Sequence, residues 1–467
     1  MLTRYTSAIL DSLRPSVIWL TRRRSETLDL RYGRAALTFA ASGAASLATI
    51  LVNLVTVPLL LHHLGNARFG VWMTLYSLVS ILGVFDFGVG LGLLTALAQC
   101  YGRNDRGQAQ RFISTAIVIL ISIAILFLLL FALMYPLIPW SAVFNVRDSV
   151  LVNETRYAMA ILVPCLVLAI PASLPARVQA GYQRGYIASM WDLLTRITIL
   201  FGVVAVAYSD AGLPWLVAVV AGMPALMGGI NGLVYFTFQS PWLRPSLQTI
   251  DYAAARSIIY GGGLFFVLQV VFALTFASDN IVITQILGPQ EVAAYAVPRT
   301  LFQSVTVATT LFLAPLWPAY GEALAKGDRA WVANTLKRSL WLGTSFSLIG
   351  AAILLLFGKN ILVLWTGSDL NVSYSLLFGF ALWVIMSTCG SAISMLMNAA
   401  FIMRFQVIVA VAMALCAIAA KIVLARRFGV TGVIWGTVIA YAFISFLPSV
   451  LYARRWLNES YVTGVRA

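Results

Sequence analysis

Charged residues are what this sequence has least of. Of its 467 residues, 10% are charged and 61% are hydrophobic, and the mean hydropathy is +0.91. Soluble domains carry about 25% charged and roughly 45–50% apolar residues. So few charges cannot cover the surface of a soluble protein of this length, which excludes a soluble globular fold. The composition instead predicts a polytopic membrane protein.

Histidine and cysteine are also scarce, with two and four residues. The cysteines fall in or at the ends of separate apolar runs without CxxC spacing: Cys100, Cys165, Cys389 and Cys416. This pattern predicts neither a disulfide framework nor a zinc site. His62 and His63 are adjacent in a predicted loop, where their side chains would point apart. We therefore expect no metal and no cofactor.

Long apolar runs dominate the remainder of the chain. A bilayer core about 30 Å thick needs about 20 apolar residues per helix. Backbone groups in lipid must be satisfied internally, and continuous apolar runs exclude the alternating pattern of a barrel. The fold class predicted is all-α, with about twelve transmembrane helices near 36–61, 70–99, 112–137, 157–175, 188–208, 214–238, 260–283, 293–319, 339–357, 374–397, 406–424 and 431–452.

Basic residues orient this array. Of the 31 lysines and arginines, 22 fall on the side of the termini, seven fall on the opposite side if Lys421 is counted there, and two lie within spans. The positive-inside rule then places both termini in the cytoplasm. The cations are spread over many loops rather than gathered on one face, so nucleic acid is not an expected partner.

The chain repeats itself weakly at an offset of about 220 residues. Three short segments recur in the same order: Leu64-Gly65 and Leu287-Gly288, Tyr101-Gly102 and Tyr320-Gly321, and Gln179 to Tyr182 and Asn398 to Phe401. Matching halves predict two six-helix lobes related by an axis along the membrane normal. The expected divisions are a cytoplasmic tail over 1–35, an N-lobe over 36–238, a linker over 239–259, a C-lobe over 260–452 and a cytoplasmic tail over 453–467.

Five segments carry a resemblance to a known family. They are LG…FGVW (64–72), DFGVG (86–90), DNIVITQILGP (279–289), AAYAVPRTLF (293–302) and GVTGVIWGT (429–437). In this order they resemble the polysaccharide-exporting branch of the multidrug/oligosaccharidyl-lipid/polysaccharide exporter superfamily. The resemblance implies two lobes around a central cavity. It also implies a flippase in the bacterial cytoplasmic (inner) membrane that moves isoprenoid-diphosphate-linked oligosaccharides to the outer leaflet for surface polysaccharide assembly, such as O-antigen or exopolysaccharide.

Two other functions stay open beside the flippase. A drug/cation antiporter has the same fold, and a membrane-embedded glycan polymerase or ligase would share the apolar composition. The enzyme is disfavoured because the outer loops are short and their few acids are scattered. Candidate partners besides the substrate are membrane lipids, H⁺ or Na⁺ as a coupling ion, and polysaccharide polymerase and chain-length proteins.

Charges inside the spans are the candidate site residues, because intramembrane ionisable groups are costly and face protein or water. Asp86 and Arg196 share one predicted depth, and Asp279 and Arg299 share another, so one cross-helix pair is expected in each lobe. Arg196 is a candidate for a diphosphate contact, since guanidinium stays charged and matches phosphate oxygens. Its alternative is an i,i+4 pair with Asp192.

More than one role stays open for Arg299 and for Asp86. Arg299 is either a substrate contact on the release side or the partner of Asp279. Asp86 is a structural pair member, an ion- or proton-coupling group, or a contact to sugar hydroxyls. Gly88, Gly90 and Gly92 follow it and predict close approach of a neighbouring helix. The run Gly261–Gly263 is either a hinge or a second site of close packing.

Overall fold

The computed structural model describes the backbone of residues 2–82, 86–209, 211–313, 316–325, 327–368, 370–400 and 402–464. Side chains are described within these ranges from 37 to 457, except at 79–82, 264, 265, 272, 276, 312, 317, 318, 322 and 325. Within these ranges every regular element is a helix. The predicted all-α class is therefore confirmed.

The first half of the chain supplies six predicted spans. The main helices are α1 (Leu2–Leu82), α2 (Val89–Arg103), α3 (Arg106–Met134), the short α4 (Trp140–Val143), α5 (Ser149–Ala172), α6 (Leu174–Gly181), α7 (Gly185–Tyr208) and α8 (Leu213–Val234). Helix α1 breaks at Gly65, where φ is 69° and ψ is 170°. It therefore contains the predicted tail, the first span and the first part of the second.

The second half repeats this series after a linker of short turns. Its helices are α9 (Tyr252–Ile286), the turn η5 (Pro289–Glu291), α10 (Val292–Leu313), α11 (Leu316–Ala325), α12 (Arg329–Thr366), α13 (Tyr374–Ala399), α14 (Met403–Phe428), α15 (Val430–Ala440), η6 (Tyr441–Phe446) and α16 (Leu447–Gly464). Ten described helices are long and apolar enough to cross a membrane. The second and eighth spans are each in two pieces, which brings the array to the predicted twelve.

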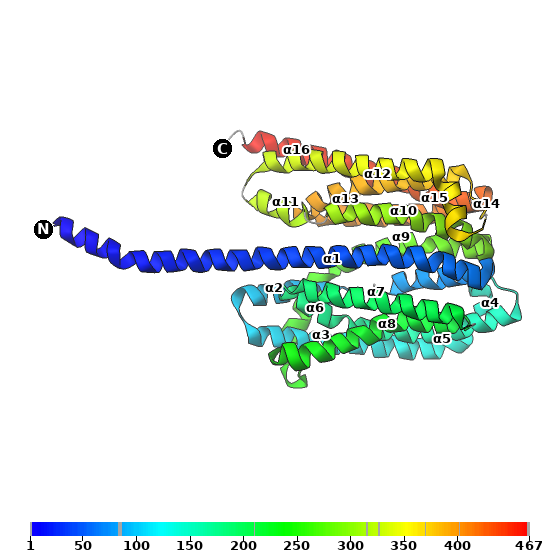
Figure 1. The fold of residues 1–467 in the computed structure, drawn as a ribbon, viewed down its shortest axis with the longest axis horizontal. Helices are drawn as coiled ribbons and strands as arrows, with labels where there is room; N and C mark the ends of the chain where they lie inside the picture. The colour runs from blue at the N-terminus through cyan, green and yellow to red at the C-terminus, as the bar shows by residue number, and fades with distance from the viewer. Residues whose placement is uncertain are drawn as a thin grey trace.

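The helices lie in two groups on either side of α1 (Figure 1). Helices α2 to α8 form one group and α10 to α16 the other, and α9 runs behind α1. Both termini lie at the same end of the bundle, which we call the terminal end; the opposite end, near α4, is the distal end. This arrangement is the one expected of two six-helix lobes.

The sequence repeat extends to the backbone conformation. Gly65 and Gly288 both adopt positive φ with ψ near extended values, 170° and 160° respectively. Asn104 and Gly327 also have positive φ, and each precedes an aspartate that caps the next helix. This places Asn104 opposite Gly327, so the alignment of Tyr101 with Tyr320 is wrong by about one helical turn.

The second span is not the continuous helix that the sequence predicts. The chain turns at residues 86–88, where Phe87 and Gly88 have positive φ, and α2 starts at Val89. Glycine packing follows immediately. A Cβ on Gly88 or Gly262 would stand closer than 3.0 Å to the other's carbonyl group, and a Cβ on Gly92 would collide with the carbonyl of Ile258. Helix α9 runs unbroken through the run Gly261–Gly263, and within this run Gly262 is the residue that serves close packing.

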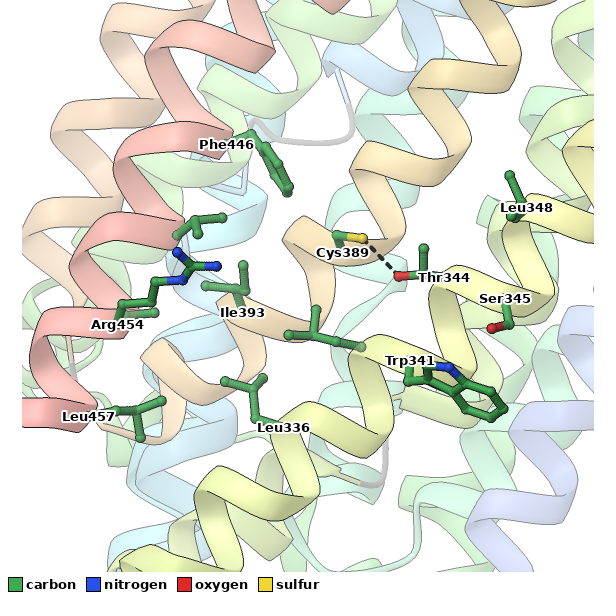
Figure 2. A pocket seen from close by; sticks show the side chains of 13 residues that line it. Leu336, Trp341, Thr344, Ser345, Leu348, Cys389, Ile393, Phe446, Arg454 and Leu457 are labelled. Carbon is green, nitrogen blue, oxygen red and sulfur yellow. Dashed lines mark hydrogen bonds between the residues drawn. The ribbon is translucent and has the colours of Figure 1, made fainter. Parts of the chain in front are cut away.

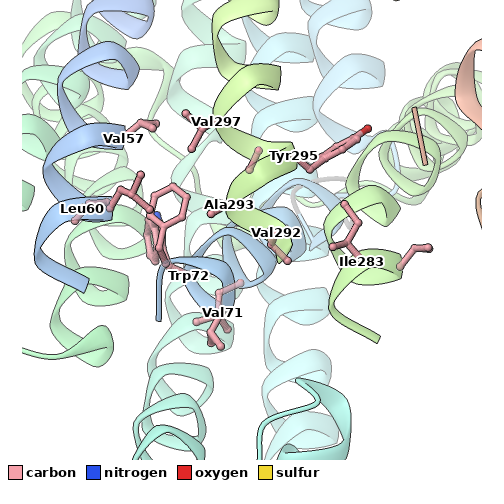
Figure 3. Close-up of a cluster of buried hydrophobic side chains, with 14 of the residues drawn as sticks. Val57, Leu60, Val71, Trp72, Ile283, Val292, Ala293, Tyr295 and Val297 are labelled. Carbon is pink, nitrogen blue, oxygen red and sulfur yellow. The ribbon is translucent and has the colours of Figure 1, made fainter. Parts of the chain in front are cut away.

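The largest apolar cluster joins the two lobes at the distal end. Val71 and Trp72 of α1 pack with Ile283 of α9 and with Val292 and Tyr295. Figure 3 shows these side chains converging from both halves of the chain. A second cluster packs α2, α3 and α6 with the first turns of α9, through Ala254 and Ile258.

Replacing Gly262 with valine should destabilise the protein by about 1–3 kcal/mol, because the added carbons must displace the backbone of Gly88. Thermal unfolding of the purified protein in detergent measures the effect. Gly263→Val is the matched control, since a Cβ at Gly263 meets no atom within 4 Å. Equal losses for the two variants would show that helix propensity, not the contact between α2 and α9, is responsible.

Candidate functional site

Asp86 is held by the first turn of α2. Its side chain is 7% exposed, and its carboxylate accepts hydrogen bonds from the backbone N–H of Gly88 (2.9 Å) and Gly90 (3.3 Å). The free N–H groups of a helix start and the positive end of its dipole both stabilise an anion. The carboxylate of Asp86 therefore provides hydrogen-bond acceptors for N–H groups at the start of α2, which lies inside the apolar span.

Gly90 leaves room for this arrangement. A Cβ there would lie 2.8 Å from Oδ2 of Asp86 and 3.1 Å from Nε of Arg177 on α6. Asp86 thus has a cation beside it, but it is Arg177 and not Arg196. The predicted Asp86–Arg196 pair is wrong. The carboxylate of Asp86 accepts hydrogen bonds from the backbone at the start of α2, and Arg196 pairs with Asp192.

Arg196 pairs with Asp192 one turn earlier in α7. The distance from Nε to Oδ1 is 3.4 Å, and both side chains are partly exposed. The same face of α7 contacts α1 through Gly185 beside Thr38 and Ser189 hydrogen-bonded to Ser42. The local pair expected from i,i+4 spacing is therefore confirmed, and it lies on the α7 face that meets α1.

Asp279 is the centre of a buried charge cluster in the second half of the chain. It is 3% exposed and lies on α9. Its Oδ1 lies 2.6 Å from Nζ of Lys421, and its Oδ2 lies 3.3 Å from Arg299 and accepts a hydrogen bond of 2.8 Å from the hydroxyl of Tyr295. The predicted Asp279–Arg299 pair is confirmed. We call Asp279, Arg299, Lys421 and Tyr295 the C-lobe charge cluster.

Lys421 is the site residue that the sequence did not reveal. The prediction placed it beside an outer loop, whereas it is fully buried in α14 and also donates to the carbonyl of Thr275 and to Ser278 (3.4 Å). Its position near the end of a predicted span made it resemble a loop cation. Only the packing of α14 against α9 brings it to Asp279.

The cluster carries more positive than negative charge. One carboxylate faces two cations, and Lys421 lies closer to it than Arg299 does. Lys421 is completely enclosed, but Arg299 is 28% exposed. A charge inside a membrane protein needs a counter-ion or water. Arg299 is thus the cation of this cluster that is free to contact an anion from outside the protein.

The distal end is closed by contacts between the two halves. Thr74 and Thr284 share a hydrogen bond of 2.6 Å, and the Asn280 amide donates to Ser77 (2.8 Å) and to the carbonyl of Met73 (3.1 Å). Gly70 lies directly against the carbonyl of Pro289. These hydrogen bonds and the apolar cluster of Figure 3 hold the two lobes together at the distal end.

Toward the terminal end, the described contacts differ between the two sides of the bundle. Helix α10 packs against α1, whereas α11, which continues the same span, packs against α12 and α13. On the other side α2 stays in contact with α9 through their glycines. The described contacts that join the two halves therefore concentrate at the distal end and between α2 and α9.

The sequence matches the profile of the family described as polysaccharide biosynthesis protein over residues 39–323. The chain belongs to this family. The match includes Asp86, Arg196, Asp279 and Arg299, but it ends before Lys421.

Two relatives of this polysaccharide biosynthesis protein have been named for transport. This chain is 22% identical to a protein named as an O-antigen transporter of Salmonella typhimurium, over 85% of this chain and 90% of that one. It is 21% identical to a protein named as an O-antigen export protein of Yersinia pseudotuberculosis, over 62% of this chain and 65% of that one. The second match thus covers slightly less than two thirds of the relative.

The fold agrees with a solved transporter. The inward-facing conformation of a multidrug resistance transporter of the multidrug/oligosaccharidyl-lipid/polysaccharide superfamily superposes with a TM-score of 0.76 at 14% identity, over 89% of this chain and 96% of that chain. The expected transporter fold is thereby confirmed. The family and its relatives identify a polysaccharide-related membrane transport protein rather than an enzyme.

Asp86→Asn should cost less than Asp86→Ala, for which we expect about 1–2 kcal/mol, because the amide oxygen keeps the hydrogen bond from Gly88 although the amide nitrogen cannot accept the one from Gly90. Thermal unfolding in detergent compares the two variants. If asparagine costs as much as alanine, then the negative charge beside Arg177 matters and the capping explanation fails.

Asp279→Asn should be strongly destabilising, by about 3–5 kcal/mol, since it leaves Lys421 buried without a counter-charge. Adding Lys421→Met to it should restore much of the loss, because the uncompensated buried cation is then gone. Unfolding temperatures of the single and double variants in detergent provide the measurement. A double variant no more stable than Asp279→Asn alone would contradict the assignment of the ion pair.

Proposed function

We propose that this transport protein moves an isoprenoid-diphosphate-linked oligosaccharide from the cytoplasmic to the periplasmic leaflet of a bacterial inner membrane. Its family is that of polysaccharide biosynthesis proteins, and its relatives are named for O-antigen export. A lipid-linked sugar has a diphosphate that hydrocarbon cannot solvate. The carrier must therefore offer a positively charged contact inside the membrane.

The excess positive charge of the C-lobe charge cluster is the observation that carries this proposal. Lys421 compensates Asp279 from within the protein, and this leaves the charge of the partly exposed Arg299 for the diphosphate. A guanidinium binds phosphate oxygens through two parallel N–H groups and stays protonated. Arg196 is the second candidate, but Asp192 already neutralises it, so its contact to substrate would be weaker.

Orientation and conformation fit a transport cycle. The excess of basic residues at the terminal end assigns that end to the cytoplasm. The seal at the distal end then faces the periplasm, and the side between α1 and α11 faces the donor leaflet. Alternating access would exchange the distal seal for one at the terminal end.

Transport is expected to depend on Arg299. In vesicles containing only this protein, Arg299→Gln should slow flipping of a fluorescent isoprenoid-diphosphate-linked oligosaccharide about tenfold or more, because a charge-assisted contact is lost. Arg196→Gln should slow it less. The rate at which label becomes inaccessible to an external quencher measures flipping.

Arg427→Gln is the matched control, since Arg427 is an exposed arginine at the end of α14. Equal rates for Arg299→Gln and the unmodified protein would reject the diphosphate contact while leaving transport intact. No flipping by the unmodified protein, together with export of a cationic drug from the same vesicles, would favour the antiporter instead.

A further inference from the structure

A crevice on the outer flank of the second half has no part in the proposed transport path. It has a volume of about 480 Å³ and lies between α12, α13 and α16, and we call it the α12–α16 crevice. Its walls are mostly apolar and include Leu336, Trp341 and Leu348 of α12, Ile393 of α13, and Val450 and Leu457 of α16. Figure 2 shows the three helices around it, with α13 as the floor.

The crevice opens to the surroundings of the bundle and not between the lobes. All its lining residues come from α12, α13, η6 and α16, and none from α1 to α11. Trp341, on its wall, is 69% exposed, and Leu348 is exposed as well. In a membrane, such an apolar opening faces the hydrocarbon chains of lipids. It is therefore distinct from the C-lobe charge cluster.

The corresponding helices of the first half pack more closely at the described positions. There the sixth span, α8, lies directly against the fourth: a Cβ on Gly228 would collide with the carbonyl of Ala172, and one on Gly232 would touch Pro175. Helix α16, in the sixth span of the second half, has no glycine before Gly464. Without glycine at these positions, α16 cannot approach its neighbours as closely, which leaves the crevice open.

The length of the crevice matches one leaflet. Along α12 it extends from Leu336 to Leu348, which at 1.5 Å per residue is about 18 Å. The hydrocarbon core of a whole bilayer is about 30 Å thick. The crevice therefore covers about half the membrane, starting near the terminal end, where α12 begins and α16 finishes. Its size suits one chain of a lipid in that leaflet.

One cation lines this mostly apolar crevice, about one helical turn from its last lining residue on α16, Leu457. Arg454 of α16 lines the crevice and lies beside Ile393 in Figure 2. No carboxylate in the described part of the chain comes within 4 Å of it. Lys337 and Arg338 follow Leu336 on α12, and both are exposed. A ligand that fits both features has an apolar chain and an anionic headgroup.

We propose that the α12–α16 crevice binds an anionic phospholipid of the leaflet at the terminal end. One acyl chain lies along Trp341 and Ile393, and the phosphate is held by Arg454. Basic groups at a membrane surface attract anionic lipids by about 1 kcal/mol each, which corresponds to about a fivefold change in binding. The site does not depend on the identity of the transported substrate.

The test uses the full chain in nanodiscs with phosphatidylglycerol that carries a photoreactive diazirine on one acyl chain. After illumination, mass spectrometry should find the label on peptides of α12, α13 and α16 that line the crevice. Arg454→Gln should lower this labelling about fivefold. Arg455→Gln, the neighbouring exposed arginine outside the crevice, should not.

Two further arms make the result decisive. Ser345→Phe, which fills the crevice, should abolish the labelling while the protein keeps its unfolding temperature. The same photoreactive chain on phosphatidylcholine should label the crevice about fivefold less. Equal labelling by both lipids, equal effects of Arg454→Gln and Arg455→Gln, or displacement by an isoprenyl phosphate but not by unlabelled phosphatidylglycerol would each overturn the proposal.

Discussion

The buried ion pair between Asp279 and Lys421 is the interaction on which the candidate site depends. It links α9 to α14 across a 2.6 Å contact from which water is excluded. Desolvating two charges is expensive, and such a pair contributes little net stability compared with apolar packing. Its importance lies in charge balance, because the single carboxylate of the cluster lies beside both Lys421 and Arg299, so that the cluster keeps one excess positive charge.

The two acids inside the spans show two different ways to keep a carboxylate in an apolar region. Asp86 is stabilised by backbone N–H groups at the start of α2, and the chain breaks a helix within the membrane to provide them. Asp279 lies within the unbroken helix α9, where the backbone N–H groups already donate to carbonyls of the same helix. Its carboxylate is therefore stabilised by side-chain cations instead. Local backbone geometry thus stabilises the carboxylate of Asp86, whereas side-chain cations stabilise that of Asp279.

The difference between these acids also marks what the sequence could predict. Hydropathy predicts the spans because one helix crosses the membrane in about 20 residues, and i,i+4 spacing predicts the Asp192–Arg196 pair. The glycine pattern predicts close packing near Gly88, though not that Gly262 is its partner. The break before α2 and the burial of Lys421 depend on contacts between segments far apart in the chain. The hydropathy pattern within a single span therefore cannot predict either feature.

The placement of charges has a consequence for movement between the lobes. In the described part of the chain, the ion pairs within the bundle, Asp279 with Lys421 and Arg299, and Asp192 with Arg196, stay inside one lobe. The bonds that join the lobes at the distal end are neutral, such as those of Thr74 with Thr284 and Asn280 with Ser77. A neutral hydrogen bond contributes about 0.5–1.5 kcal/mol net, because water can replace it. The lobes can therefore part at this end without exposing an unpaired charge to lipid. The charged groups of each lobe therefore keep their partners when the lobes part, and the excess positive charge of the C-lobe charge cluster stays within one lobe.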